Sequence, residues 1–392
     1  MVGDRMTDDS TSSPRALAGV RVIDISSTPA AAWTSRLLAD AGADVVLVEP
    51  IEGHPLRRTG PFTDGGDSVP EAQFLANKRS VTLDLDDAPA RDVVRQLIEN
   101  ADVVVSSHSP RRLATLGFEY ASFGLSDLIM THVTPHGMTG ALAEVPGNDL
   151  TVAARSGWAS INGNDDREPL KPAAWTSSCC AGIAAYAATV AALRWRDQHP
   201  GEGQEVDVAE TEVMAATFAP GMLRSLYTGK AQGRHSSDDQ LAGPVPVADG
   251  HFALTLSRAH FWRDAMNLLG LEDLAEDERY GASWFRQSHR EEYSGRVAEA
   301  MAKWNKMDLF EELAIRRVVA GPVLGMGELR ATDHLEVRGY WRRPADDPDG
   351  PEYPGPAYQM TETPQTLDRR APRAGEHNDE VLGVIADAGG AR

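Results

Sequence analysis

The chain has 392 residues, of which 42% are hydrophobic, and this is enough to form a large core shared between two domains. Its 58 acidic and 38 basic residues leave a formal net charge of −20, and such a surface repels polyphosphate and excludes nucleic acid as the main partner. The two cysteines, Cys179 and Cys180, are neighbours and poorly placed to form a bridge, so a cytoplasmic protein is expected.

The first half of the chain alternates apolar strands with helical patterns. Residues 1–15 are polar and predict a disordered leader. Near-continuous apolar runs typical of buried parallel strands follow at residues 20–25, 44–48, 101–105 and 128–130, with helices at about 30–42 and 87–98. This order predicts a Rossmann-like α/β domain. The turn after the first strand, residues 26–30 (SSTPA), lacks the Gly-rich fingerprint, so neither a nicotinamide nor a flavin cofactor is expected.

The second half predicts a smaller domain and an extended arm. The uncharged apolar run of residues 179–193 is shorter than the roughly 18 residues expected of a membrane span, so we expect a buried helix and no membrane association. A strand is predicted at 205–208, another at 251–254, and helices over 258–316. Residues 344–374 are rich in proline and predict an arm without a fold of its own.

Eight segments of the chain, in order, resemble the class III CoA-transferase (CaiB/BaiF) family. They are residues 17–24 (LAGVRVID), 38–45 (LADAGADV), 48–50 (VEP), 77–85 (NKRSVTLDL), 201–208 (GEGQEVDV), 320–323 (AGPV), 334–340 (HLEVRGY) and 375–382 (GEHNDEVL). The resemblance spans roughly residues 16–385. It implies a large Rossmann-like CoA-binding domain of residues 16–200 and 325–392, a small inserted α+β domain of residues 201–324, and two chains interlocked as a homodimer.

The same resemblance implies that coenzyme A and its acyl thioesters are substrates, together with carboxylic acids, and that no metal takes part. An acidic protein needs local basic groups to hold this anion, and Arg57 with Arg58, Lys78 with Arg79, and Arg111 with Arg112 are candidates. Family members contact CoA at the positions that are here Ala30, Asn77, Lys78, Arg79, Ser107, His108, His136 and Gly137. The alternatives are a solvated turn for Lys78 and Arg79, and an ordinary surface histidine for His136.

The expected catalytic positions carry unusual residues. In the family's transferases an aspartate four residues before a helix glycine attacks the thioester, and a carboxylate suits this step because its anhydride is as activated as the thioester. Counting back from Gly182 places Ser178 at that position. The racemase branch uses a His-Asp pair, which is here Asn148 and Asp149. Since Asn148 does not exchange protons near neutral pH, Asp149 is the one remaining candidate acid or base.

Each candidate has a structural alternative. The Ser178 hydroxyl is expected to cap free N–H groups at the start of the apolar helix, and Asp149 to cap a helix that begins near Leu150. A further hypothesis gives Cys179 a lowered pKa at the helix N-terminus and a role as acyl acceptor; the alternative is a small residue buried in the core. The histidines His235, His251 and His260 lack metal-ligand spacing, and no metal site is predicted.

Three functions therefore remain open from the sequence. The leading one is a CoA-transferase that acts on acyl-CoA thioesters with Ser178 in place of the usual aspartate. The second is a non-catalytic subunit that pairs with an active paralogue in a heterodimer. The third is an acyl-CoA racemase, isomerase or dehydratase that uses Asp149. The acyl group and the pathway are not readable from the chain.

Overall fold

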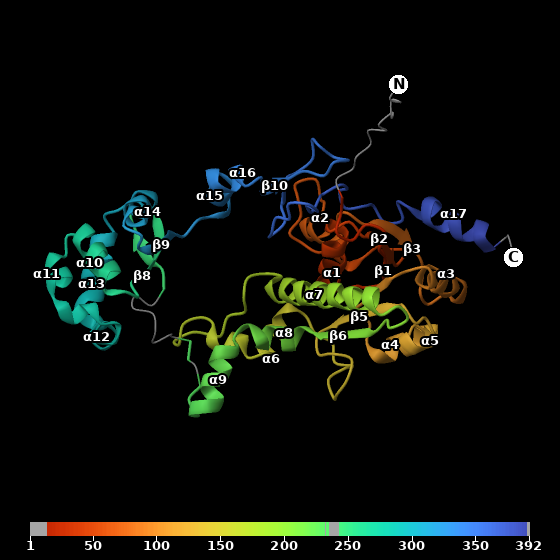
Figure 1. The fold of residues 1–392 in the computed structure, drawn as a ribbon, viewed down its shortest axis with the longest axis horizontal. Coiled ribbons are helices and arrows are strands. Elements are labelled where there is room, and N and C mark those ends of the chain that lie inside the picture. Colours follow the sequence, from red (N-terminus) through yellow and green to blue (C-terminus); the bar gives the residue numbers. More distant parts are fainter. Residues whose placement is uncertain (1–13, 232, 235–242, 390–392) are drawn as a thin grey trace, which may run out of the picture. The chain divides into compact units, whose positions relative to one another are not determined.

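The structure is a computed structural model that describes residues 14–231, 233–234 and 243–389 (Figure 1). The predicted leader, up to residue 13, lies outside the described residues. The chain divides into two compact units. The large unit takes its described residues from Met1–Asn162, Pro169–Leu223 and Gly339–Arg392, and the small unit from Gly163–Glu168 and Arg224–Arg338.

A six-stranded parallel sheet forms the centre of the large unit. Its strands lie in the order β3-β2-β1-β4-β5-β6, so the direction in which strands are added reverses between β1 and β4. The order and the parallel pairing confirm the predicted Rossmann-like α/β architecture. The strand bounds are β1 Arg21–Asp24, β2 Asp44–Glu49, β3 Arg79–Thr82, β4 Val103–Ser106, β5 Ile129–Thr134 and β6 Glu205–Ala209.

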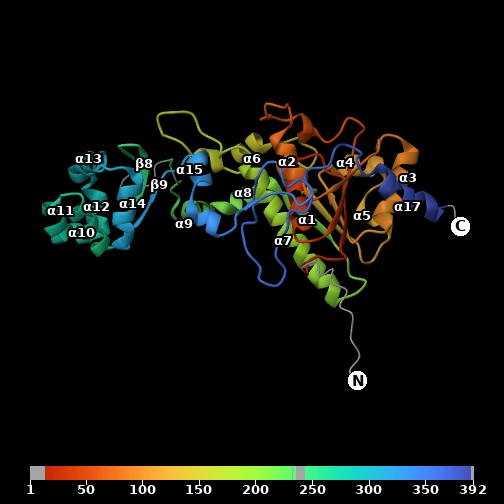
Figure 2. The ribbon, with the colours of Figure 1, turned by 90° about the horizontal axis from the view of Figure 1, so that it is seen from above.

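Helices cover both faces of this sheet. On one face, α1 (Pro29–Asp40) and α7 (Thr176–Gln198) lie side by side and pack on the strands (Figures 1 and 2). On the other face, α3 (Ala88–Glu99) and α4 (Pro110–Leu116) bury a second cluster against the sheet. The remaining helical segments of this unit are η1 Pro55–Arg58, α2 Val69–Leu75, α5 Tyr120–Phe123, α6 Asp149–Arg155, η2 Trp158–Ile161, α8 Glu210–Thr217 and α17 Asn378–Gly389.

The contact between α1 and α7 is close because α7 carries Gly182. A Cβ atom at this position would lie 2.8 Å from the Ala30 carbonyl oxygen and 2.8 Å from Trp33 Cβ. Among the described helices, α7 is long and apolar enough to cross a membrane by length and composition alone. Its packing against α1, β5 and β6 is that of a core helix, as the sequence predicts.

The C-terminal arm returns to the first strands of the sheet. It includes two short strands, β10 (Trp341–Arg342) and β11 (Tyr353–Pro354), and is otherwise irregular, as its proline content predicts. Beyond it, His377 N donates to the Ser80 carbonyl oxygen at 2.9 Å, and Asn378 bonds both the backbone N–H and the hydroxyl of Thr82. The chain therefore closes its large unit with residues from both ends of the sequence.

The small unit contains an antiparallel three-stranded sheet of β7 (Val245–Val247), β8 (Gly250–Thr255) and β9 (Val319–Pro322). Its core surrounds Trp262, Phe252 and Tyr293, which are buried. The other segments are α10 Ala259–Leu268, α11 Glu272–Glu276, η3 Glu278–Gly281, α12 Ser283–Ser288, α13 Arg290–Met301, α14 Lys306–Ile315, α15 Met326–Arg330 and α16 Asp333–Val337. Helix α9 (Ala219–Thr228) spans the boundary between the units.

The boundaries differ from the predicted small domain of residues 201–324. Strand β6 lies in the main sheet beside β5, and α8 packs against α7, so residues up to Leu223 belong to the large unit. At the other end, α15 and α16 extend the small unit to Arg338. Residues 201–204 form a loop that leads into β6 within the large unit.

Candidate active site at the carboxyl edge of the sheet

The parallel strands bring their carboxyl ends to one edge, and the polar loops that follow them form the candidate site. In open α/β sheets, ligands bind at this edge where the strand order reverses, which here is between β1 and β4. Residues 26–28 follow β1 and residues 107–109 follow β4. The two loops are joined because Ser27 N donates to Ser107 Oγ at 2.9 Å.

Several buried polar atoms at this reversal point lack a hydrogen-bond partner in the described part of the chain. They are Ser26 Oγ, Thr28 Oγ1 and His108 Nε2. Burial lowers the pKa of His108 to about 4, and the charge of Arg112 adds to this, so the ring is neutral at physiological pH. Such unpaired groups indicate a site for a polar ligand. Ala30, fully buried in the first turn of α1, places a helix N-terminus beside them.

The basic residues that the sequence proposes for CoA are mostly engaged in internal contacts. Lys78 is fully buried, and its ammonium lies 3.0 Å from Asp24 Oδ2 and 2.9 Å from the Ala32 carbonyl oxygen. Burial is the largest single effect and would raise the pKa of Asp24, but the charge of Lys78 and the hydrogen bonds to the carboxylate together outweigh it, and the pKa is lowered. Arg79 pairs with Asp44 and Glu380.

Asn77 binds the C-terminal arm, and the remaining basic residues differ in whether they form ion pairs. The side chain of Asn77 binds the C-terminal arm, since its Oδ1 accepts from the backbone N–H groups of Asp368 and Arg369. The Arg57 guanidinium is tied to Glu49 and Glu71. By contrast, Arg111, in the first turn of α4, makes no ion pair with the described residues. It lies three positions after His108 and close to the reversal point.

The loop after β5 carries His136 and Gly137. His136 Nδ1 lies 3.0 Å from the hydroxyl of Thr211 on α8, and its Nε2 is buried without a partner among the described residues. Burial lowers the pKa of His136, and the charge of Arg155 lowers it further. Gly137 has a φ of 84°, a left-handed conformation that favours glycine, and it turns the chain past the Asp207 carboxylate.

Asp149 holds the start of α7. Its Oδ1 accepts from the backbone N–H groups of Ser177 at 3.0 Å and Ser178 at 3.4 Å, and its Oδ2 lies 3.0 Å from Lys171 Nζ. The expected cap on its own helix is wrong, because Asn148 caps α6 in a capping box: its Oδ1 accepts from Thr151 N, and its backbone N–H donates to Thr151 Oγ1. Asp149 instead neutralises free N–H groups of the neighbouring helix.

The hydroxyl of Ser178 does not cap α7 as expected. Ser178 is buried in the first turn, and its Oγ makes no hydrogen bond with the residues that the structure describes. The residue before the helix is Trp175, whose φ of 68° is strained for a bulky side chain. The Asp149 carboxylate, which accepts hydrogen bonds from the first N–H groups of α7, therefore supplies the cap that the serine hydroxyls do not.

The structure does not support the hypothesis of an activated Cys179. Burial, with smaller contributions from the neighbouring Cys180 and from Asp149, raises the pKa of Cys179 to about 11. A thiol in this setting stays protonated and is a poor nucleophile. The Asp149 carboxylate already occupies this helix N-terminus, and it comes from another helix, so the local sequence gives no sign of it.

A further carboxyl group, which is not among the site residues predicted from the sequence, lies at the same edge. Glu210 directly follows β6, is the first residue of α8, and is 3% exposed. Burial raises its pKa to about 7, and the charge of Asp149 adds to the rise. Its position after a predicted strand was the available signal, because the carboxyl end of a parallel strand leads to the ligand edge.

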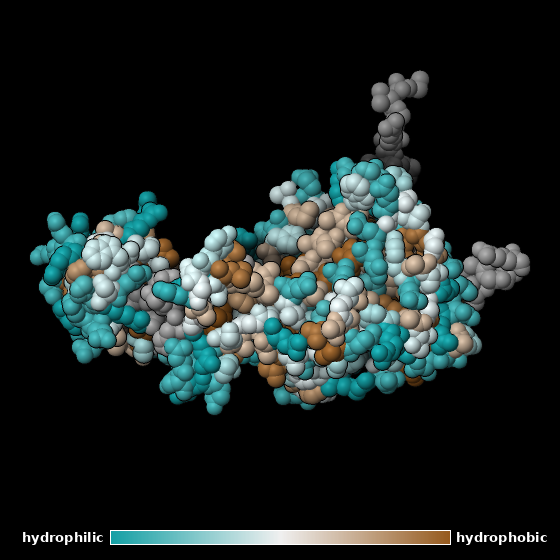
Figure 3. Space-filling view, turned by 90° about the horizontal axis from the view of Figure 1, so that it is seen from below, coloured by the Kyte–Doolittle hydropathy of each residue, from teal (hydrophilic) through white to brown (hydrophobic). Residues whose placement is uncertain are grey.

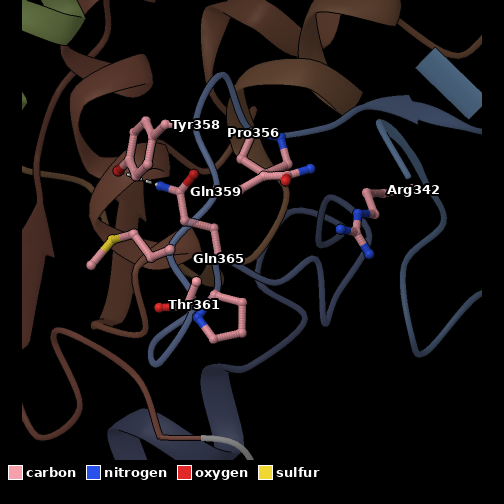
Figure 4. Close-up of a pocket in the computed structure, with 8 residues that line it drawn as sticks. Arg342, Pro356, Tyr358, Gln359, Thr361 and Gln365 are labelled. Carbon is pink, nitrogen blue, oxygen red and sulfur yellow. Dashed lines mark hydrogen bonds between the residues drawn. The ribbon is translucent and has the colours of Figure 1, made fainter. Parts of the chain in front are cut away.

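The C-terminal arm forms a cavity of about 310 Å³ between its own residues (Figure 4). Tyr358 and Gln365 are hydrogen-bonded there at 2.8 Å, and the Tyr358 hydroxyl lies 3.1 Å from that of Tyr186 on α7. These contacts seat the arm on α7. The cavity does not include the residues of the carboxyl edge.

Within the described residues, no cluster of three or more His, Cys, Asp or Glu side chains is arranged to hold a metal ion. The absence of a metal therefore stays a prediction from the sequence. The chemistry of the edge depends on the carboxyl, hydroxyl and imidazole groups described above.

Comparison with known proteins identifies the scaffold. The chain matches the model of CoA-transferase family III over residues 17–378. The chain belongs to this family. It is 33% identical over 394 residues to the succinate–glutarate CoA-transferase of Agrobacterium fabrum, covering 97% of this chain and 98% of that protein. This match over nearly the whole length assigns the chain to the class of CoA-transferases.

Two further relatives extend the comparison. The chain is 33% identical to the succinyl-CoA:(R)-benzylsuccinate CoA-transferase subunit BbsE of Thauera aromatica, covering 89% of this chain and 90% of that one. A solved CaiB/BaiF family protein from Brucella suis superposes with a TM-score of 0.84 at 28% identity, covering 95% of this chain and 99% of that chain. The CoA-transferase family III assignment therefore agrees at the levels of sequence and fold.

Proposed function

We propose that this chain, as a homodimer, exchanges coenzyme A between an acyl-CoA thioester and a free carboxylic acid. The observation that carries this proposal is the gathering of polar residues at the carboxyl edge of the sheet. They are Ser107, His108, His136 and Gly137, at positions where family members contact CoA, and Asp149, Ser178 and Glu210. The relatives named above act on dicarboxylic acids or their CoA esters. We therefore infer that small dicarboxylates are the substrate class, and that the protein works in the cytoplasm.

The nucleotide portion of CoA is proposed to bind where the strand order reverses. The buried, unpaired Ser26 Oγ, Thr28 Oγ1 and His108 Nε2 supply polar partners, and the neutral ring of His108 supplies a face on which adenine stacks. Arg111 supplies a cation for the phosphates. Lys78 supports this site indirectly, because it fixes Asp24 and the first turn of α1.

The thioester end is proposed to lie between the loop of His136 and Gly137 and the start of α7. The first turn of α8 also lies at this corner, and its positive dipole end favours the carboxylate of a substrate. A racemase or isomerase that depends on Asp149 is less well supported. Its carboxylate already accepts from two backbone N–H groups and pairs with Lys171.

A second candidate is a non-catalytic subunit of a heteromeric transferase. It is supported by Ser178 at the position of the usual aspartate and by a relative that is named as a subunit. Purification of the chain alone separates the two functions. The enzyme is incubated with succinyl-CoA and glutarate, and glutaryl-CoA is followed by chromatography. Turnover by the isolated chain supports the homodimeric enzyme, whereas turnover that needs a co-expressed paralogue supports the subunit.

A further inference from the structure

Glu210 is a buried acid with no internal role that the structure reveals. It is 3% exposed, and no hydrogen bond or ion pair joins its carboxylate to a described residue. Its oxygens keep a small contact with solvent, since they are not among the fully buried atoms that lack a partner. Buried carboxyl groups in proteins are normally paired or hydrogen-bonded, because an isolated one is costly to desolvate. A buried and unpartnered carboxyl group therefore indicates a site where a ligand or reacting atom completes its contacts.

The position of Glu210 links it to the residues of the candidate site. The next residue, Thr211, donates from both its backbone N–H and its hydroxyl to the Pro135 carbonyl oxygen, at 3.1 and 2.7 Å. Pro135 packs on Gly147, where a Cβ atom would lie 2.6 Å from Pro135 Cβ. Two residues later, Asp149 binds the N–H groups of Ser177 and Ser178. The first turn of α8 thus lies in one contact chain with the start of α7.

Two independent features mark this corner as open to a ligand. His136, hydrogen-bonded to Thr211, has a buried Nε2 without a partner among the described residues. Glu210 itself comes from the carboxyl end of β6 at the ligand edge of the sheet. Helix α8 packs against both α6 and α7. An acyl group bound at this corner lies near the Glu210 carboxylate, whereas the Ser178 side chain carries no carboxylate.

We propose that the Glu210 carboxylate is the nucleophile of this enzyme and takes the place of the aspartate that Ser178 replaces. This inference rests on the proposed CoA transfer and assigns its covalent step. Glu210 lies in the first turn of α8, whereas Ser178 lies in the first turn of α7, and both helices begin at the same corner of the candidate site. The protonation behaviour of the group fits the role, since a carboxylate with a pKa of about 7 is both ionised in part at neutral pH and more nucleophilic than an ordinary one.

The steps balance with the substrates alone. A Glu210 Oε attacks the thioester carbon, the C–S bond breaks, and CoA leaves as a thiolate, which gives a mixed anhydride. The thiolate then attacks the glutamyl carbon, so the donor acid departs as a carboxylate and a glutamyl-CoA thioester remains. The acceptor carboxylate attacks this thioester and releases the thiolate again. The thiolate finally attacks the acceptor acyl carbon, forming the new acyl-CoA and restoring the Glu210 carboxylate.

The test traps the glutamyl intermediate. The full-length protein is incubated with succinyl-CoA and treated with hydroxylamine, which converts an activated carboxyl group to a hydroxamate, and the modified residue is located by mass spectrometry of its peptides. We expect the hydroxamate on Glu210. Glu210→Gln is expected to bind CoA in isothermal titration and to lose turnover by about 10³-fold or more. Glu212→Gln, an exposed acid on the same helix, is the matched control and is expected to keep wild-type turnover.

The results distinguish the proposed role of Glu210 as nucleophile from the proposed transfer of CoA. Wild-type turnover with the hydroxamate on Asp149, or with an acyl group found on Ser178 or Cys179 before hydroxylamine is added, overturns the role of Glu210 and leaves CoA transfer in place. Turnover retained by Glu210→Gln has the same meaning. A wild-type protein that exchanges CoA with no donor tested, and yields no hydroxamate, overturns both. Retained CoA binding by Glu210→Gln excludes misfolding as the cause of lost turnover.

Discussion

At the scale of single residues, Glu210 links catalysis to stability. Its pKa rises from 4.5 to about 7 on folding, so the unfolded chain releases this proton at lower pH than the folded one. Between these values the folded state binds more protons, and stability falls as the pH rises. This pKa shift corresponds to about 3 kcal/mol of the free energy of unfolding, a difference between low and high pH that is lost in full above pH 7.

We therefore expect Glu210→Gln to be more stable than the wild type at pH 8, by up to about 3 kcal/mol, and nearly equal to it at pH 5. Urea unfolding at the two pH values measures the difference. Glu212→Gln controls for the loss of one charge and is expected to show no such pH dependence. A Glu210→Gln variant that gains nothing at pH 8 would show that the carboxylate is already well solvated or paired.

The turnover of the wild type is expected to depend on the same ionisation. Activity rises with pH through about 7 and then levels off, because the ionised carboxylate is the reactive form. Several charged or titratable groups lie on the elements packed against α8, and among them Asp149 raises the pKa of Glu210. The charged ones are Asp149 and Arg155 on α6 and Asp207 on β6; the thiols of Cys179 and Cys180 on α7 and the ring of His136, beside Thr211, are the titratable ones.

Asp149→Asn removes the negative charge but retains an acceptor for the N–H groups of Ser177 and Ser178. We expect the midpoint of the pH–rate profile to move to lower pH in this variant, since ionised Glu210 is then less repelled. The profile of turnover against pH measures this shift. A midpoint that stays near 7 in Asp149→Asn, or moves upward, would contradict the coupling between the two carboxyl groups.

Lys78 gives a residue-scale test of a role that the sequence suggested. Because its ammonium is buried beside Asp24, we expect Lys78→Met to leave an uncompensated buried carboxylate and lower the free energy of unfolding by about 3–5 kcal/mol. Chemical denaturation measures this loss. In the double variant Asp24→Asn with Lys78→Met, much of the stability should return. If Lys78→Met instead lowers the affinity for CoA and leaves the free energy of unfolding unchanged, Lys78 contacts CoA directly, as the sequence suggested.

At the scale of elements, Asn77 ties the arm to the sheet. Its Nδ2 donates to Asp40 and to the Thr366 carbonyl oxygen, and its Oδ1 accepts from the N–H groups of Asp368 and Arg369. Asn77 also has a φ of 63°, which asparagine tolerates and alanine does not. We expect Asn77→Ala to cost roughly 2–4 kcal/mol and to speed cleavage of residues 344–374 in limited proteolysis.

Asn77→Gly is the matched control for this prediction. Glycine accepts the positive φ without strain, so this variant isolates the lost side-chain hydrogen bonds. It should still release the arm, although less than alanine does. Cleavage of Asn77→Gly at the wild-type rate would show that backbone strain, and not the amide side chain, determines the behaviour of the alanine variant.

The elements also show what the sequence could and could not predict. The apolar runs predicted the parallel sheet and α7 because their burial depends on local pattern. The start of α7 was misjudged because its cap, Asp149, comes from another helix and the chain gives no local sign of it. Likewise, Lys78 looks solvated in sequence, and only the folded sheet places it beside Asp24. Glu210 belongs to no motif, and apart from its place directly after a predicted strand only its burial in the folded chain distinguishes it from other acidic residues.

At the scale of the whole molecule, the proposed dimer is suggested by apolar side chains left on the surface. Brown, hydrophobic residues interrupt the polar surface in Figure 3. On α9, four neighbouring apolar residues are exposed, by 39–86%: Met222, Leu223, Leu226 and Tyr227. On α7, Ile183 is 53% exposed in an otherwise apolar helix. Patches of this kind mark interaction surfaces in soluble proteins.

We expect the chain to sediment as a dimer and Leu226→Glu with Tyr227→Glu to weaken the association. Burial of such side chains contributes about 1.5–3 kcal/mol each, so the dissociation constant should rise by about 100-fold or more. Sedimentation equilibrium measures it, and Arg224→Glu, an exposed position on the same helix, controls for added negative charge. A wild type that is monomeric at micromolar concentration contradicts the homodimer. A double variant that dimerises as tightly as the wild type places the interface elsewhere than on α9.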